Sequence, residues 1–131
     1  MLRVRDQVLA TTIFDQVSTL AGEKIKDANF YRSYGSWAHR LPVLVLTAGL
    51  IQALTFLEAR GGEPGRRLLT DLARVLDYES SDSLLNHIRH GNLSQYMITT
   101  RHTLAALKWY KRFAITILGV KEGEVEKEQT V

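Results

Sequence analysis

The longest uncharged stretch of the chain runs from Leu41 to Leu57 and reads LPVLVLTAGLIQALTFL. Its nearly continuous apolar character is typical of a buried helix or of a membrane span. At about 1.5 Å per residue, a helix of this length reaches only ~25 Å, which is shorter than a hydrocarbon core of ~30 Å. Pro42, Gly49 and Gln52 also interrupt it. We therefore expect a buried central helix and no membrane partner.

Helical periodicity extends on both sides of this stretch, and strand-like alternation is nearly absent. Glycine, proline and capping residues divide the periodic segments into six expected helices. Their approximate ranges are 4–21, 28–40, 42–60, 64–76, 84–90 and 92–118. The predicted fold is therefore all-α: a single-domain bundle of about six helices with a long, mostly buried C-terminal helix.

Individual residues set the expected helix ends. Pro42 should end one helix and open the next, because proline disfavours helical geometry in the residue before it and suits a first helical turn. The serine-rich cluster Ser80–Ser83 should cap the short fifth helix. Asn92, with Gln95 three residues later, resembles a capping box at the start of the last helix.

Composition limits the class of protein and of partner. The 131 residues fit one domain, and the absence of cysteine excludes disulfides and thiolate metal sites. Residues 120–131 carry two lysines against four glutamates, a net charge of −2 within a total of +3. We assign 1–119 to the helical bundle domain and 120–131 to a charged tail that we expect to be disordered. The basic body favours a polyanionic partner, and the charged first residues, unlike a signal peptide, favour a cytoplasmic location.

A basic ridge is expected along the last helix. On a helical wheel at ~100° per residue, Arg101, Lys108 and Arg112 fall within about 40° of one another, while most other directions are apolar. Cations spaced by one and two turns can follow a phosphate backbone. The alternative interpretation is a solvated face with local ion pairs.

A second polar stripe lies on the helix expected over residues 28–40. Arg32, Ser36 and His39 align at i, i+4 and i+7, with Arg40 beside them. Hydroxyl and guanidinium groups together suit phosphate and sugar oxygens. The same pattern is also typical of the outer face of an amphipathic helix.

Aromatic residues recur at helical spacing, which favours core packing over stacking platforms for bases. They are Tyr31, Tyr34, Trp37, Trp109, Tyr110 and Phe113.

Residues for catalysis or metal binding do not form a recognisable set. His87 and His90 have a workable chelating spacing, but no third ligand accompanies them, so we expect no metal and no cofactor. The acids are scattered, whereas two-metal nuclease chemistry needs converging carboxylates. Asp71, one turn from Arg67 and Arg74, is expected in a surface ion pair. Asp6 interrupts the apolar stripe of the first helix without an evident reason.

Two segments go beyond pattern. One is Phe30–Pro42, FYRSYGSWAHRLP, continuing into Thr47–Phe56, TAGLIQALTF; the other is Leu107–Ala114, LKWYKRFA. Together they resemble the small helical subunit of type III-B CRISPR effector complexes, the Cmr (RAMP-module) family. The order of the segments, the length and the all-helical pattern also match, and the resemblance spans most of residues 1–118.

The resemblance implies a non-catalytic subunit of an antiviral ribonucleoprotein, with no small-molecule substrate. In that family, small subunits stack with copies of themselves into a minor filament beside other Cmr-type subunits. Their basic surfaces line the channel where target RNA pairs with guide RNA. The residues that we expect to contact RNA are Arg32, Arg40, Lys108, Lys111 and Arg112, from the matching segments, and Arg101, from the ridge.

Two other functions remain open from the residues alone. Short helices around Gly91 can mimic a helix-turn-helix, which would make the chain a DNA-binding regulator. A last helix that is apolar nearly all round suits a core better than a major groove. A metal-dependent enzyme built on His87 and His90 is the other alternative.

Overall fold

The computed structural model describes residues 2–25 and 27–123, and all the regular structure in these ranges is helical. The helices are α1 Leu2–Gly22, α2 Phe30–Ala48, α3 Leu50–Arg60, α4 Gly62–Val75, α5 Ser81–His90 and α6 Leu93–Thr116. The predicted all-α bundle of about six helices is confirmed. The larger part of the predicted charged tail, residues 124–131, lies outside the described residues.

Both predicted caps near the end of the bundle are confirmed. The Ser80 hydroxyl accepts a hydrogen bond from the Ser83 backbone N–H at 3.1 Å, at the start of α5. The Asn92 side chain accepts from the Gln95 N–H at 2.9 Å, and the Gln95 side chain accepts from the Asn92 N–H at 3.0 Å. These capping bonds satisfy backbone donors that the first turn of a helix leaves unpaired.

The predicted helix break at Pro42 is wrong. The α2 helix continues through Pro42 to Ala48, and the chain turns at Gly49, whose φ of 93° and ψ of 159° favour glycine. Proline costs this helix one backbone hydrogen bond. Leu41 and Val45, on either side of it, are buried in the core, and their burial offsets that loss. The uncharged stretch is therefore divided between α2 and α3.

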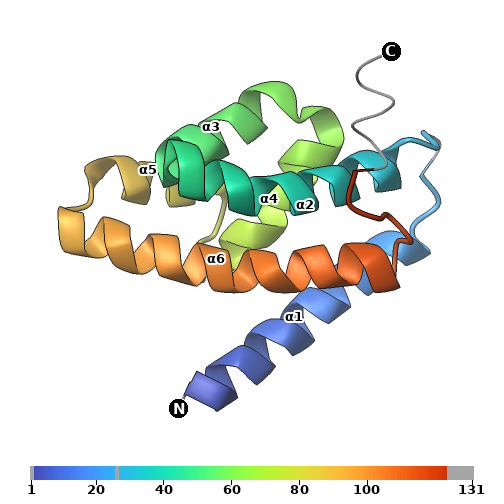
Figure 1. The fold of residues 1–131 in the computed structure, drawn as a ribbon, viewed down its shortest axis with the longest axis horizontal. Helices are drawn as coiled ribbons and strands as arrows, with labels where there is room; N and C mark the ends of the chain where they lie inside the picture. Colours follow the sequence, from blue (N-terminus) through green and yellow to red (C-terminus); the bar gives the residue numbers. More distant parts are fainter. Residues whose placement is uncertain (1, 26, 124–131) are drawn as a thin grey trace.

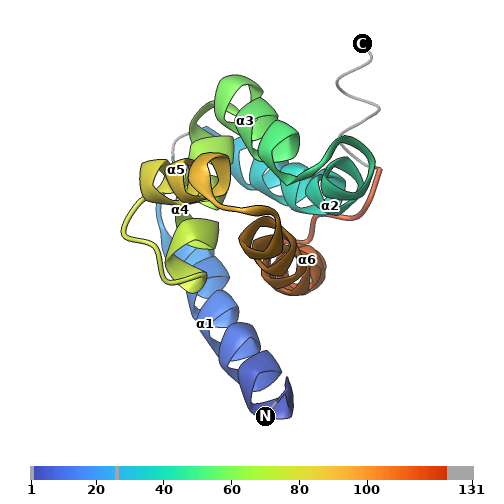
Figure 2. The same ribbon diagram turned by 90° about the vertical axis from the view of Figure 1, so that its left-hand side faces the viewer.

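Helices α2 and α6 lie side by side and antiparallel (Figure 1). Near one end of the pair, the Ile51 N–H just after α2 donates to the Tyr96 hydroxyl of α6 at 3.2 Å. At the other end, Gly35 of α2 lies against Val120, which follows α6. The N-terminal part of α1 extends beyond the other helices (Figure 2), and α1 packs on α4 and α6.

The core draws apolar side chains from every helix. Fully buried members include Ile13, Leu20, Leu41, Leu54, Leu57, Leu72, Leu84 and Leu107. The uncharged stretch contributes several of them, yet Val43 and Leu46 on the outer face of α2 are 58% and 72% exposed. None of the helices in the described part of the chain is long and apolar enough to cross a membrane. The stretch is therefore a two-sided element, with one side in the core and the other open.

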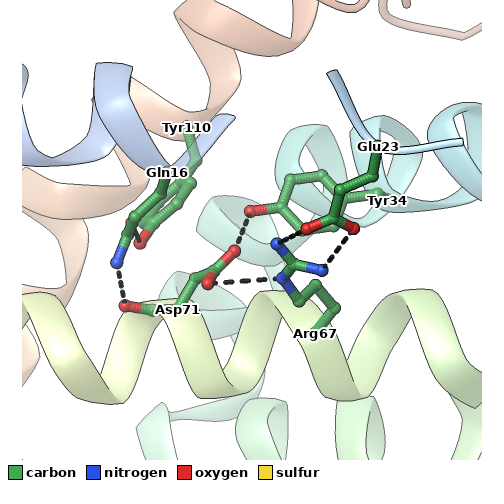
Figure 3. Close-up of polar contacts among 6 residues, drawn as sticks. All are labelled: Gln16, Glu23, Tyr34, Arg67, Asp71 and Tyr110. Carbon is green, nitrogen blue, oxygen red and sulfur yellow. Dashed lines mark hydrogen bonds and ion pairs between the residues drawn. The ribbon is translucent and has the colours of Figure 1, made fainter. Parts of the chain in front are cut away.

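A buried carboxylate lies where four helices meet (Figure 3). Asp71 of α4 is 4% exposed and accepts a hydrogen bond from the Tyr34 hydroxyl of α2 at 2.7 Å. Its other carboxylate oxygen is 3.6 Å from Nε of Arg67, whose remaining nitrogens donate to Glu23 at 2.9 and 3.0 Å. The expected surface ion pair of Asp71 is therefore wrong: its partner Arg67 is correct, but the carboxylate is in the core.

The backbone of Asp71 extends this network to α1 and α6. Its carbonyl accepts from the Gln16 side chain of α1 at 2.9 Å, and the Gln16 carbonyl oxygen accepts from the Tyr110 hydroxyl of α6. Burial raises the pKa of Asp71 above its ordinary value, against the opposing hydrogen bond from Tyr34. Burial also raises the pKa of Tyr34 and Tyr110, so both hydroxyls stay protonated and donate.

Candidate nucleic-acid interface

The outer face of α6 carries three cations. Arg101, Lys108 and Arg112 are all exposed, on the face that the helical wheel predicts. The opposite side of α6 is buried in the bundle through Thr103, Ala106, Leu107, Tyr110 and Ala114. We call the three exposed cations the α6 ridge. Because the opposite side of the helix packs into the protein, the ridge has a rigid backbone.

Trp109 supports two of the three ridge cations. Nζ of Lys108 lies 5.4 Å and Cζ of Arg112 lies 5.7 Å from the centroid of the Trp109 ring. Phe113 stacks on the same indole with 5.7 Å between centroids. The Trp109 N–H donates to the Asp6 carboxylate at 2.9 Å. Asp6 therefore interrupts the apolar stripe of α1 because it accepts a hydrogen bond from Trp109, a role that the sequence did not reveal. The Trp109 ring, fixed in this way, holds two cations by cation–π attraction.

A fourth cation reaches this surface from α1. The Arg5 guanidinium lies 3.0 Å from Nε2 of His102, one residue beyond Arg101. Arginine only donates, so this nitrogen of His102 accepts. Phe14 of α1 packs edge-on against Phe113 of α6, with 5.5 Å between ring centroids. Sequence reasoning missed Arg5, because only the crossing of α1 over α6 brings it to the ridge.

The polar stripe of α2 is not an open face. Arg32 is exposed, but Ser36 and His39 are 6% and 4% exposed. The chain that follows α6 covers them, and Nε2 of His39 donates to the Val120 carbonyl at 2.8 Å. The interpretation of Ser36 and His39 as a phosphate-facing surface is therefore wrong. A helical wheel identifies the side away from the core, but it does not reveal a distant segment that folds across that side.

We call residues 119–123 the C-terminal strap. Val120 is 4% exposed, and its N–H donates to the Ala114 carbonyl at 2.9 Å. A Cβ atom on Gly35 would lie 2.6 Å from Cβ of Val120, so only glycine leaves room for this side chain. The packed domain therefore includes Val120, one residue beyond the predicted boundary.

Two predicted RNA contacts lie beside the strap and not on the α6 ridge. Arg40 is half-buried, with Cζ 4.5 Å from the centroid of the Trp37 ring. It lines a hollow of about 210 Å³ together with Lys121 and Glu122 of the strap. Nζ of Lys111 lies 3.5 Å from the Glu122 carboxylate. The six predicted contacts thus divide into the α6 ridge, the strap side with Arg40 and Lys111, and Arg32 on the first turns of α2.

The aromatic and histidine predictions have mixed outcomes. Core packing is correct for Tyr34, Trp37 and Tyr110, which are buried. The other three aromatics, Tyr31, Trp109 and Phe113, are half-buried and pack against the core. Among residues 2–25 and 27–123, no group of three or more His, Asp or Glu side chains could hold a metal ion. The His87 ring instead packs on Tyr78 at 5.3 Å between centroids, and Nδ1 of His90 donates to the Asn86 carbonyl at 2.9 Å.

Fold and surface together define a class: a small all-helical protein with an exposed basic ridge on its longest helix. The comparisons with known proteins give the family. The family described as CRISPR-associated protein (Cas_Cmr5) matches residues 5–117. The CRISPR system Cmr subunit Cmr5 of Thermus thermophilus is 39% identical over 117 residues, which cover 89% of this chain and 98% of that protein. The chain belongs to the Cmr5 family.

A solved structure agrees with this assignment. The crystal structure of a CRISPR-associated Cmr5 family protein from Thermus thermophilus superposes with a TM-score of 0.78 at 40% identity. The match covers 87% of this chain and 96% of that one. The resemblance drawn from the two sequence segments is therefore confirmed.

Proposed function

We propose that this chain is a non-catalytic small subunit of a type III-B CRISPR effector complex, which acts in the cytoplasm in antiviral defence. It binds other Cmr-type subunits, stacks with copies of itself into a minor filament, and contacts the backbone of guide and target RNA. Membership of the Cmr5 family supports the subunit role, because the Thermus relative is named a Cmr subunit and matches over nearly its whole length.

The α6 ridge is the observation that carries the RNA contact. Three cations occupy the exposed face of a helix whose opposite side is buried. Where guide pairing reads the sequence, a protein subunit need only contact phosphates. Cations on a rigid helix suit that task, since the helix backbone has little conformational freedom left to lose on binding. The helix-turn-helix alternative is not favoured, because α6 packs along α1 and α2 and is not free to enter a major groove.

Contacts with protein partners have a separate support. Exposed apolar side chains occur on both helices of the α2–α6 pair. They include Val43, Leu46, Leu93 and Met97, exposed by 58%, 72%, 75% and 48%. Apolar surface of this kind is typical of protein–protein contact, which agrees with a subunit of a larger assembly.

Charge removal from the ridge tests the RNA contact. Lys108→Ala with Arg112→Ala in the reconstituted complex should weaken target-RNA binding and lower the slope of log K against log salt. The slope should fall by about 0.7 to 0.9 for each lost phosphate contact. Binding is measured by titration at several salt concentrations.

Two exposed arginines elsewhere provide a matched control. Arg60→Ala with Arg66→Ala removes the same charge from α3 and α4, and we expect the wild-type salt slope. If the ridge pair and the control pair give the same slope, the ridge does not contact RNA.

A further inference from the structure

The C-terminal strap is fixed at one point before its charged residues begin. Gly119 has a φ of 71°, which turns the chain back after α6. Val120 then makes three contacts: its N–H with Ala114, its carbonyl with His39, and its side chain against Gly35. Whatever follows Val120 therefore starts beside α2 and the last turn of α6. Those are the elements that hold Arg40 and Lys111.

The first acidic residue after this anchor already occupies one predicted RNA contact. The Glu122 carboxylate is 3.5 Å from Nζ of Lys111, with Lys111 38% and Glu122 64% exposed. Glu122 also lines the hollow that Arg40 lines. The fold thus places the Glu122 carboxylate on the side of the molecule where phosphates are expected.

We propose that Glu122 is a built-in competitor of RNA phosphate for the strap-side cations, with Lys111 as its principal site. This proposal rests on the proposed RNA-binding function and concerns its regulation. A tethered carboxylate has a high effective concentration, yet one exposed ion pair is weak. Glu122 therefore suppresses binding of RNA that engages Lys111 alone. It yields to a backbone that engages the α6 ridge at the same time.

A comparison of two charge-removing variants tests the proposal. Glu122→Gln and Glu63→Gln each remove one exposed carboxylate that pairs with a cation, Lys111 at 3.5 Å and Arg66 at 3.7 Å respectively. The probe is a fluorescein-labelled oligouridylate, titrated with the full-length chain at several salt concentrations. We expect Glu122→Gln to bind about 1.5- to 5-fold tighter than wild type, as the loss of one exposed ion pair predicts. Its salt slope should be steeper by about 0.7, and Glu63→Gln should match wild type.

The Lys111→Ala background isolates the pair. Because Glu122 acts through Lys111, the gain from Glu122→Gln should disappear when Lys111 is already absent. A gain that persists there, or one that Glu63→Gln reproduces, overturns the proposal and points to net charge alone. A purely stabilising ion pair predicts a lower melting temperature for Glu122→Gln with unchanged affinity, which also overturns it.

The two proposals fail in distinguishable ways. If Glu122→Gln binds as wild type does while the Lys108 and Arg112 variants weaken binding, competition by the strap is wrong and the RNA-binding function stands. If wild type, Glu122→Gln and the ridge variants all bind oligouridylate equally or not at all, and the complex is indifferent to the ridge variants, both proposals are wrong.

Discussion

Asp6 and Trp109 form the contact that fixes the centre of the α6 ridge. The two residues are far apart in sequence, and the carboxylate accepts the indole N–H at 2.9 Å. The ring in turn lies under Lys108 and Arg112. Without Asp6, the half-buried Trp109 N–H would have no acceptor, and an unpaired buried donor costs free energy. The structural role of Asp6 therefore depends on the indole N–H of Trp109.

Asp6→Ala should lower the free energy of unfolding by about 1 kcal/mol, because it leaves the Trp109 N–H unpaired. In the Trp109→Phe background, the same substitution should cost much less, since phenylalanine has no N–H to satisfy. Urea denaturation of the four proteins in this cycle measures the difference. An equal cost of Asp6→Ala in both backgrounds would show that Asp6 acts through something other than this hydrogen bond.

At the scale of elements, the strap depends on a notch in α2. Gly35→Ala would place a Cβ 2.6 Å from Cβ of Val120, so the strap must move or the helix must shift. We expect a loss of about 1–3 kcal/mol of stability, as is typical of overpacking. Val120→Gly, which removes the clashing side chain, should make Gly35→Ala nearly neutral. Gly22→Ala is the control, because nothing lies within 4 Å of its Cβ position. Chemical denaturation measures all four, and a Gly35→Ala cost that survives Val120→Gly would contradict the notch.

Elements also show which features the sequence could reveal. The caps at Ser80 and Asn92 were predictable because donor and acceptor lie within one turn of each other. The continuation of α2 through Pro42 was not predictable, because burial of Leu41 and Val45 outweighs one missing backbone hydrogen bond. On α6, the wheel placed the ridge on the correct face, since a helix backbone fixes that angle. On α2, the same method failed for His39, whose partner Val120 is distant in sequence.

For the whole molecule, α1 decides how the ridge is presented. It touches α6 through Asp6 and Phe14, and it reaches the buried Asp71 of α4 through Gln16. Its N-terminal part otherwise extends beyond the other helices (Figure 2). No local pattern predicts such a crossing, and so the contribution of Arg5 and the burial of Asp71 were both missed. The network around Asp71 joins four helices, so its protonation bears on the stability of the entire bundle (Figure 3).

The pH dependence of unfolding tests that link. Burial raises the pKa of Asp71 above its ordinary value of 3.8. At a pH between the unfolded-state and the folded-state pKa, the folded protein therefore binds more protons than the unfolded chain. Stability from this residue is present below its unfolded-state pKa and is lost as the pH rises through the folded-state pKa. Relative to Asp71→Asn, which keeps an acceptor for Tyr34, wild type should therefore lose stability with rising pH. The slope is at most about 1.4 kcal/mol per pH unit.

Glu23 provides a control of opposite sign. The hydrogen bond from Arg67 lowers the pKa of Glu23 below its ordinary value of 4.5, so its contribution is present above that value and is lost as the pH falls. Relative to Glu23→Gln, wild type should gain stability with rising pH. Urea denaturation of the three proteins across the acid range measures both differences. The free energy of unfolding of wild type relative to Asp71→Asn could instead rise with pH, as we expect relative to Glu23→Gln. In that case, attraction by Arg67 outweighs burial in setting the pKa of Asp71. The carboxylate at the centre of the bundle would then stabilise the fold in its charged form.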